Sequence, residues 1–290
     1  MKMIFTTILS VCVAAGLSAQ EMKQYVPEAG DWAVGMNLKP LINYMGGLFN
    51  QSAGVSIDQI GGEAVTAGIG DYVMNPTVSI MGKYMLTDNF AVRANLGINI
   101  NTANDRAYVR DDKAYFLNPL SQGKVVDSRF RRNSGLSLMA GAEYRVGEKR
   151  IQGVFGGGLL VAFQNQSTSY TYGNAMTEIN QRPSSKYGIY DTDGGYYRTL
   201  KNWNSMADIY TGLALTAGVE YFVAPKVALG AEVSLCGYYV FGNQSYSQYE
   251  WYNDATEAVE IWTELETPGD RGFHLATENL GGSLYLSFYF

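Results

Sequence analysis

Apolar residues occupy every second position in eight segments of this chain, most of them about ten residues long, the length of a membrane-crossing strand. In the segment 31–38, Trp32, Val34 and Met36 share one side of the alternation, and small or polar residues take the other. A β-strand points successive side chains to opposite faces, so the alternation predicts strands with one apolar face. The other seven segments are 75–86, 90–100, 136–146, 151–164, 209–221, 227–235 and 280–290.

The connections between these segments alternate strictly between short and long. The three short turns are 87–89, 147–149 and 224–226. The four long connections are 39–74, 101–134, 165–207 and 241–277. A transmembrane barrel has this order, because its short turns lie on the periplasmic side and its long loops on the outer side. We therefore predict an all-β fold, an eight-stranded antiparallel up-and-down transmembrane β-barrel with four long extracellular loops.

The first residues predict an export signal. Lys2 precedes an apolar stretch that runs from Met3 to Leu17, and the small residue Ala19 stands just before polar residues. The stretch is shorter than the ~20 apolar residues of a spanning helix, so a cleaved signal peptide at 1–19 is favoured over a membrane anchor. The mature chain, 20–290, is then a single outer-membrane β-barrel domain.

Composition fits a barrel better than a large soluble core. The chain holds 33 glycines and 22 tyrosines. Small residues allow strands to approach and curve inside a narrow barrel, and tyrosine suits the boundary between hydrocarbon and water. No segment after the signal has 18 consecutive apolar residues, so we expect the chain to cross a membrane with strands. With the signal removed, Cys236 is the only cysteine, which excludes an intrachain disulfide.

Three stretches carry a resemblance to a known family: GDWAVGMNLKPLINYMGGLFN at 30–50, GKYMLTDNFAVRANLGI at 82–98 and LYLSFYF at 284–290. The chain resembles the small outer-membrane β-barrel proteins of Bacteroidetes, which are broadly similar to the barrel domains of OmpA-like and OmpW-like proteins. The resemblance spans most of the mature chain. It implies a place in the outer-membrane lipid of a Gram-negative cell and a route of assembly, and it implies no activity.

The last strand is similar to the signal that such proteins present to the barrel-assembly machinery. An aromatic terminal residue follows apolar residues at alternate positions. The residues that match this pattern are Leu284, Leu286, Phe288 and Phe290. The resemblance thus implies the assembly machinery as a partner, bound through the C-terminal strand.

The predicted inward faces carry charges of both signs, on strands that a barrel places near one another. These residues are Lys83, Arg93, Glu143, Arg145, Glu220 and Glu232. Charges enclosed in a narrow barrel are costly unless they are paired, so we predict an ion-paired network that fills the lumen. A narrow porin or small-solute channel is the alternative, which is disfavoured because eight strands leave little room beyond their own side chains.

Catalytic and cofactor motifs are missing from the sequence. The one histidine, His274, falls in the last long connection and is interpreted as a solvated loop residue; no GxSxG-like or HExxH-like spacing is present. The glycines at 156–158 are not followed by the Lys-Ser/Thr of a phosphate loop, which favours close backbone approach instead. We predict a protein that is not an enzyme, with no catalytic site, cofactor or metal.

Two long connections are rich in tyrosine and tryptophan, at 165–206 and 241–276. Exposed tyrosines give a large contact area at low entropic cost, so these loops suit a surface ligand. The favoured alternative is that the rings pack on one another, or that 259–263 extends the strands beyond the bilayer. The second loop holds seven carboxylates against Arg271 alone, which disfavours nucleic acid as a partner. Divalent-cation binding at this acidic rim is less favoured than a plain solvated loop.

Overall fold

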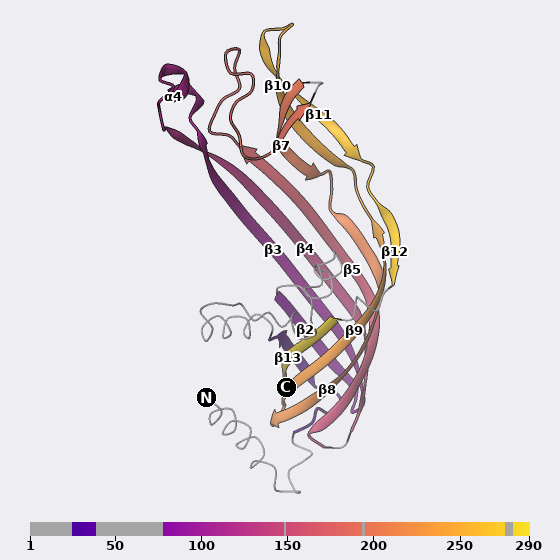
Figure 1. Ribbon diagram of the computed structural model, residues 1–290. Coiled ribbons are helices and arrows are strands. Elements are labelled where there is room, and N and C mark those ends of the chain that lie inside the picture. The colour runs from indigo at the N-terminus through magenta and orange to yellow at the C-terminus, as the bar shows by residue number, and fades with distance from the viewer. Residues whose placement is uncertain (1–24, 39–77, 148, 193–194, 276–280) are drawn as a thin grey trace.

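The computed structural model describes residues 25–38, 78–147, 149–192, 195–275 and 281–290, which form a β-barrel with an attached sheet (Figure 1). The barrel strands are β1 (Trp32–Asn37), β2 (Val78–Thr87), β3 (Phe90–Arg110), β4 (Lys124–Val146), β5 (Ile151–Thr171), β8 (Asp208–Ala224), β9 (Val227–Phe241) and β13 (Gly281–Tyr289). The predicted signal peptide at 1–19 and the first long connection at 39–74 lie outside the described residues.

The barrel is closed because its last strand pairs with its first. Strands β1 to β5 pair in chain order, β5 pairs with β8, β8 with β9, and β9 with β13. β13 then pairs with β1 in a register that sets Tyr289 opposite Ala33. All of these pairs are antiparallel. The prediction of an all-β, eight-stranded, antiparallel up-and-down barrel is confirmed.

The outside of the barrel carries a band of exposed apolar side chains. On β3, Phe90, Val92, Leu96 and Ile100 are exposed, whereas Ala91 is buried. Ten residue steps of roughly 3.3 Å, tilted by about 40°, give this band a height of about 25 Å, the height of the apolar band of membrane barrels. A contiguous apolar surface of this extent is unfavourable in water, so the band requires an apolar environment.

Three barrel strands run far beyond the apolar band and carry a second sheet. β3, β4 and β5 continue through 101–110, 124–134 and 165–171, and β5 also pairs with β7. The further strands are β6 (Ile189–Thr192), β7 (Gly195–Asn204), β10 (Ser245–Asn253), β11 (Ala258–Thr267) and β12 (Arg271–Leu275). We call the three strand extensions, together with β6, β7, β10 and β11, the projecting sheet; it stands above the barrel in Figure 1. β12 pairs with β9 instead.

The long connections contain more strand than the sequence predicted. Of the connection at 101–134, only 111–123 lies between strands, and it includes the short helix α4 (Asp112–Leu117). Residues 259–263 fall within β11, in agreement with the favoured interpretation that they extend the sheet. Within the described part of the chain, no helix has the length and apolar character to cross a membrane.

The short turns lie at the end of the barrel opposite the projecting sheet. The Thr87 hydroxyl accepts two backbone N–H groups of the turn after β2, at 3.0 and 3.3 Å. In the turn after β8, Lys226 has a φ of 60° and forms an ion pair with Asp31 just ahead of β1. Trp32 and Phe290 exchange backbone hydrogen bonds of 2.8 and 2.9 Å at the same end. The first and last barrel strands are thus fastened to each other and to this turn.

Candidate functional site: the charged lumen

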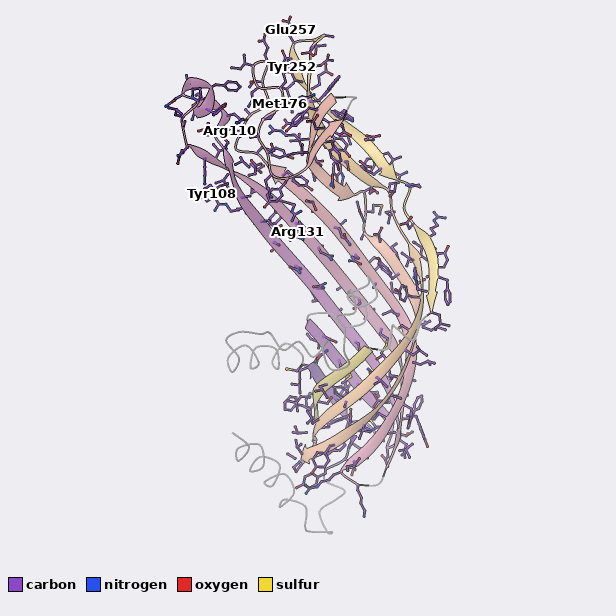
Figure 2. The ribbon with its side chains drawn as sticks, viewed as in Figure 1. Tyr108, Arg110, Arg131, Met176, Tyr252 and Glu257 are labelled. Atoms are coloured by element: carbon purple, nitrogen blue, oxygen red, sulfur yellow. The ribbon has the colours of Figure 1, made fainter. Side chains whose placement is uncertain are left out.

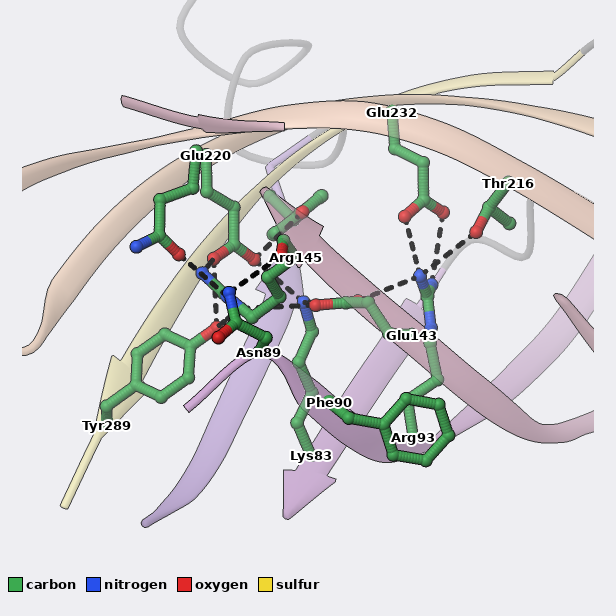
Figure 3. A network of polar contacts seen from close by, with 12 residues as sticks. Lys83, Asn89, Phe90, Arg93, Glu143, Arg145, Thr216, Glu220, Glu232 and Tyr289 are labelled. Atoms are coloured by element: carbon green, nitrogen blue, oxygen red, sulfur yellow. Dashed lines mark hydrogen bonds and ion pairs between the residues drawn. The ribbon is translucent and has the colours of Figure 1, made fainter. Parts of the chain in front are cut away.

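The six charged residues predicted to line the lumen all lie on the inner face of the barrel, and each is at most 6% exposed. The strand alternation that points apolar neighbours outward points these side chains inward. Their positions are Lys83 on β2, Arg93 on β3, Glu143 and Arg145 on β4, Glu220 on β8 and Glu232 on β9. The structure brings all six into one network of polar contacts (Figure 3).

Four of these residues form a closed ring of ion pairs. Lys83 Nζ lies 2.7 Å from an oxygen of Glu143 and 2.7 Å from an oxygen of Glu220. The guanidinium of Arg145 contacts the same two carboxylates, at 3.1 and 2.5 Å. Each cation therefore binds both carboxylates, and each carboxylate binds both cations. A charge-assisted hydrogen bond is roughly twice as strong as a neutral one, so the ring ties β2, β4 and β8 together across the lumen.

The other two residues form an arm attached to this ring. Arg93 donates two hydrogen bonds to the two oxygens of Glu232, at 2.6 and 3.0 Å, the bidentate geometry that guanidinium and carboxylate groups favour. The same guanidinium lies 3.4 Å from Glu143 and 3.4 Å from the Thr216 hydroxyl. Glu143 thus connects the arm to the ring, as Figure 3 shows.

Neutral polar side chains complete the network. Arg145 donates to Gln152 at 2.9 Å and to the Tyr289 hydroxyl at 2.6 Å. The hydroxyls of Tyr289 and Tyr285 in turn donate to Glu220, at 2.9 and 3.0 Å. With these partners, residues from seven barrel strands, β2 to β5, β8, β9 and β13, meet in the lumen.

Sequence reasoning missed the two tyrosines because it searched the inner face for charge alone. Tyr285 and Tyr289 stand at inward positions of β13, each directly after an outward residue, Leu284 and Phe288. The same alternation that located the charged residues would have placed both tyrosines inside. A large ring with one polar atom suits a lumen position where the hydroxyl reaches a carboxylate.

Charge is balanced within the network. Three cations face three carboxylates, all of them buried. Burying an ion pair costs several kcal/mol per ion, and this cost is recovered only when geometry and hydrogen bonding are both good. A complete network keeps the charges compensated, whereas a partial one leaves a buried charge without its partner. The arrangement thus fills the lumen with side chains that bind one another.

The residues of the predicted assembly signal face the outside of the barrel. Leu284, Phe288 and Phe290 are exposed, and Leu286 is half-buried. They belong to the strand that pairs with β1 and closes the barrel, apart from Phe290, which follows it. Recognition by the assembly machinery remains a prediction.

Aromatic residues of the two predicted recognition loops pack on one another in the projecting sheet. Tyr197 stacks on Tyr190 with ring centroids 4.9 Å apart, and its edge meets Tyr249 at 5.4 Å and Trp262 at 5.6 Å. Tyr249 and Trp262 lie 5.2 Å apart. The cluster joins residues of 165–206 to residues of 241–276, so ring packing gives these loops a shared internal structure.

Several carboxylates of the acidic rim are engaged within the same sheet. Glu250 pairs with Arg198 at 2.6 Å, and Glu260 accepts hydrogen bonds from Asn253 and Thr256. No cluster of three or more His, Cys, Asp or Glu side chains with metal-binding geometry occurs among the described residues. The expectation that the protein binds no metal stays a prediction.

His274 lies on a strand and not in a loop, which corrects its predicted place. It belongs to β12, opposite Tyr238 of β9, and its exposed ring stacks on the Tyr238 ring with centroids 5.3 Å apart. The segment 271–275 pairs with β9 because the backbone of β9 continues past the apolar band and offers free ladder positions. Exposure of the ring agrees with the prediction of a solvated residue.

Asp112 fastens the loop after β5 to the tip of the β3–β4 hairpin. Its carboxylate accepts hydrogen bonds from the backbone N–H of Ser184 at 2.6 Å, from Asn180 at 3.1 Å and from Arg110 at 3.1 Å. Burial alone would raise the pKa of this carboxyl, but the hydrogen bonds from Ser184, Asn180 and Arg110 outweigh it and hold the pKa below its usual value. The ionised form is therefore the one that holds the loop.

Replacing Asp112 by alanine is expected to release this loop. Trypsin should then cut faster after Lys186, because the local free energy of opening falls by about 1–3 kcal/mol when the acceptor is lost. Asp112 binds its partners best when ionised, so the attachment should persist at neutral pH and weaken as the pH falls through the lowered pKa. Amide exchange at Ser184 measures this, with the exposed Glu264→Ala as the control that should change neither rate.

Two of the distant structural neighbours of this chain are outer membrane proteins. No protein-family model matches the chain, and no curated protein matches it. The outer membrane protein OprG from Pseudomonas aeruginosa is 13% identical, with a TM-score of 0.30, over 92% of this chain and 98% of that one. A major outer membrane protein from Thermus thermophilus is 15% identical, with a TM-score of 0.30, over 73% of this chain and 90% of that one. The resemblance to OmpA-like and OmpW-like proteins of Bacteroidetes stays a prediction.

Proposed function

We propose that this chain is an outer-membrane β-barrel with a structural or surface-interaction role, whose lumen is sealed by the paired charged network. The observation that carries the proposal is the ring of Lys83, Glu143, Arg145 and Glu220, extended through Arg93 to Glu232. Side chains that bind one another across the barrel occupy the space that a solute would need. The proposal assigns no catalytic residue and no cofactor.

The apolar band supports the membrane location. Its height of about 25 Å and the alternation with a polar lining are what a strand-built membrane span requires. The N-terminal sequence 1–19 supplies the export signal in this proposal, and the C-terminal strand with Phe288 and Phe290 supplies the contact with the assembly machinery. The short turns then face the periplasm, and the projecting sheet stands outside the cell.

The projecting sheet is the surface through which we propose that the protein interacts with a ligand. Its strands and ring clusters give the described parts of the segments 165–206 and 241–276 a defined shape, which lowers the entropic cost of binding. Binding to envelope or host polymers is expected to vanish when 172–204 or 245–267 is trimmed. Binding that survives both deletions would contradict a role for these segments.

A narrow porin is the competing function, and conductance in planar bilayers separates the two. Because the lumen is sealed, the purified chain is expected to give no discrete, steady conductance steps. A known porin at the same protein concentration is the positive control and should give such steps. Stable steps from the unaltered chain would overturn the proposal in favour of the channel. The double variant Arg93→Ala with Glu232→Ala keeps the charge balance but removes the arm, so it is expected to leak more than the unaltered chain.

A further inference from the structure

A strip of basic side chains lies on the outer face of the β3–β4 extension, directly above the apolar band. The two strands pair without a bulge from Phe90 to Arg110, so the outward positions continue unchanged from the band into the extension. Ile100 is the last apolar outward residue of the band on β3. The next outward residue of β3 after Ile100 is Thr102, and Arg132 of β4 stands opposite it. Arg106 follows two outward positions further along β3. The strip is therefore continuous with the surface that meets hydrocarbon.

The two arginines of this strip have no ionic partner among the described residues. Arg106 and Arg132 are exposed, and no ion pair or hydrogen bond joins either side chain to another described residue. On the opposite face of the same strands, Arg129 and Arg131 both bind Asp105, at 3.0 Å each. Both inward arginines thus have an ionic partner within the protein, whereas the two outward ones have none among the described residues.

Exposed aromatic rings alternate with these arginines. Phe130, next outward after Arg132 on β4, is 43% exposed, and Tyr108, next outward after Arg106 on β3, is 74% exposed. Tyr108 and Arg131, labelled in Figure 2, belong to opposite faces of the extension. Aromatic rings gather at the interfacial level of membrane barrels, where an apolar ring and a polar head meet different surroundings. Phe130, four residues beyond the band, stands near that level, and Tyr108, eight residues beyond the band, stands further out.

The height of the two arginines above the apolar band determines which lipid headgroups can reach them. Arg132 is two residues beyond the band and Arg106 six, which places them about 5 and 15 Å above it at roughly 3.3 Å per residue and a tilt of about 40°. A small phospholipid headgroup reaches only the first, because the headgroup layer adds about 5–8 Å on each side of the core. A sugar headgroup that carries phosphate can reach both.

The two sides of the projecting sheet carry net charges of opposite sign. The segment 101–134 holds seven basic and four acidic residues, a surplus of three positive charges. The segment 241–276 holds seven carboxylates and one arginine, a surplus of six negative charges. An anionic lipid is attracted to the first side and repelled by the second.

We propose that the outer face of β3 and β4 binds a phosphate-bearing glycolipid of the outer leaflet, with Arg132 and Arg106 as its phosphate ligands. Guanidinium groups bind phosphate through paired hydrogen bonds, and the apolar band below supplies the surface for the acyl chains. Phe130 and Tyr108 pack beside the sugar. This inference rests on the proposed function, because it requires the barrel to stand in the outer membrane with the projecting sheet outside.

The test measures binding of phosphorylated lipid A to the full chain in neutral detergent, by native mass spectrometry. The double variant Arg106→Gln with Arg132→Gln is expected to bind about 25-fold more weakly, since each basic residue near an anionic lipid contributes about fivefold. The matched control is Arg129→Gln with Arg131→Gln, which removes the same charge from the inner face and is expected to change binding by less than about threefold. Lipid A stripped of phosphate should bind the unaltered chain as weakly as the outer double variant binds the intact lipid.

Equal losses in the two double variants would overturn the inference, because binding would then follow net charge alone. Equal binding of phosphorylated and dephosphorylated lipid would also overturn it. Competition by millimolar inorganic phosphate would overturn it too, because it marks a site for free phosphate. A dimer that dissociates in the outer variant would overturn it as well, because it marks an interface between copies of the chain. Each variant is first checked for a heat-modifiable barrel. A folded barrel that fails the lipid arm rejects this inference alone, whereas loss of the barrel in the unaltered chain rejects the proposed function.

Discussion

Replacing Glu220 by alanine is expected to lower the free energy of unfolding by about 3–5 kcal/mol. This carboxylate binds Lys83 at 2.7 Å and Arg145 at 2.5 Å and accepts the hydroxyls of Tyr285 and Tyr289. Its removal leaves two buried cations sharing one remaining carboxylate of the ring. Unfolding by urea from lipid vesicles, followed by tryptophan fluorescence, measures the loss.

A second variant separates the loss of charge balance from the loss of packing. Lys83→Met combined with Glu220→Leu restores the balance, with Arg93 and Arg145 facing Glu143 and Glu232. The double variant is expected to lose less stability than the single variants Lys83→Met and Glu220→Leu lose in sum, by a coupling of about 1–3 kcal/mol. The exposed Glu264→Ala should stay within about 0.5 kcal/mol of the unaltered chain. Simple addition of the two single effects would contradict the pairing.

Replacing Gly141 by valine is expected to cost about 3 kcal/mol, near the upper end for overpacking. A Cβ at Gly141 of β4 would lie 2.1 Å from the carbonyl oxygen of Gly157 and 2.5 Å from the Cα of Gly158. These are backbone atoms of β5, so the clash is relieved only by moving a strand. The glycines at 156–158 were interpreted from sequence as a place of close backbone approach, and this contact agrees with that interpretation.

The control for this variant is a glycine with open space beside it. A Cβ at Gly82 of β2, on the outer face, meets no heavy atom within 4 Å. Gly82→Val should therefore be neutral or slightly stabilising, because valine suits a strand better than glycine does. The same urea titration compares the two variants. Equal stability of the two would mean that the close approach of β4 and β5 does not constrain the barrel.

The barrel strands were predictable because one face of each meets an apolar surrounding. On β3, the alternation from Phe90 to Ile100 is visible in the sequence, and the structure extends that strand to Arg110. Beyond Ile100 neither face of the sheet meets hydrocarbon, so the apolar alternation ends although the pairing with β4 continues. The same reason hid β10, whose polar and aromatic residues resemble a loop, whereas for β11 the sequence had already suggested that 259–263 extends the strands.

The sequence predicts that the charged side chains point into the barrel, but it does not predict which of them form ion pairs. Lys83 stands directly opposite Arg93 in the β2–β3 register, a like-charged neighbour that sequence spacing would have paired with it. Its two carboxylates come from β4 and β8, 60 and 137 residues further along the chain. Which strands meet across the lumen depends on how the barrel closes, and the strand pattern alone does not determine that.

Heat-modifiable electrophoresis in detergent tests the central claim most directly, namely that the strands close into a barrel with an apolar outside. The unboiled chain is expected to migrate faster than the boiled chain, because a closed hydrogen-bonded barrel stays compact in dodecyl sulfate until it is heated. Identical migration before and after boiling, from a chain that dissolves in water without detergent, would contradict it.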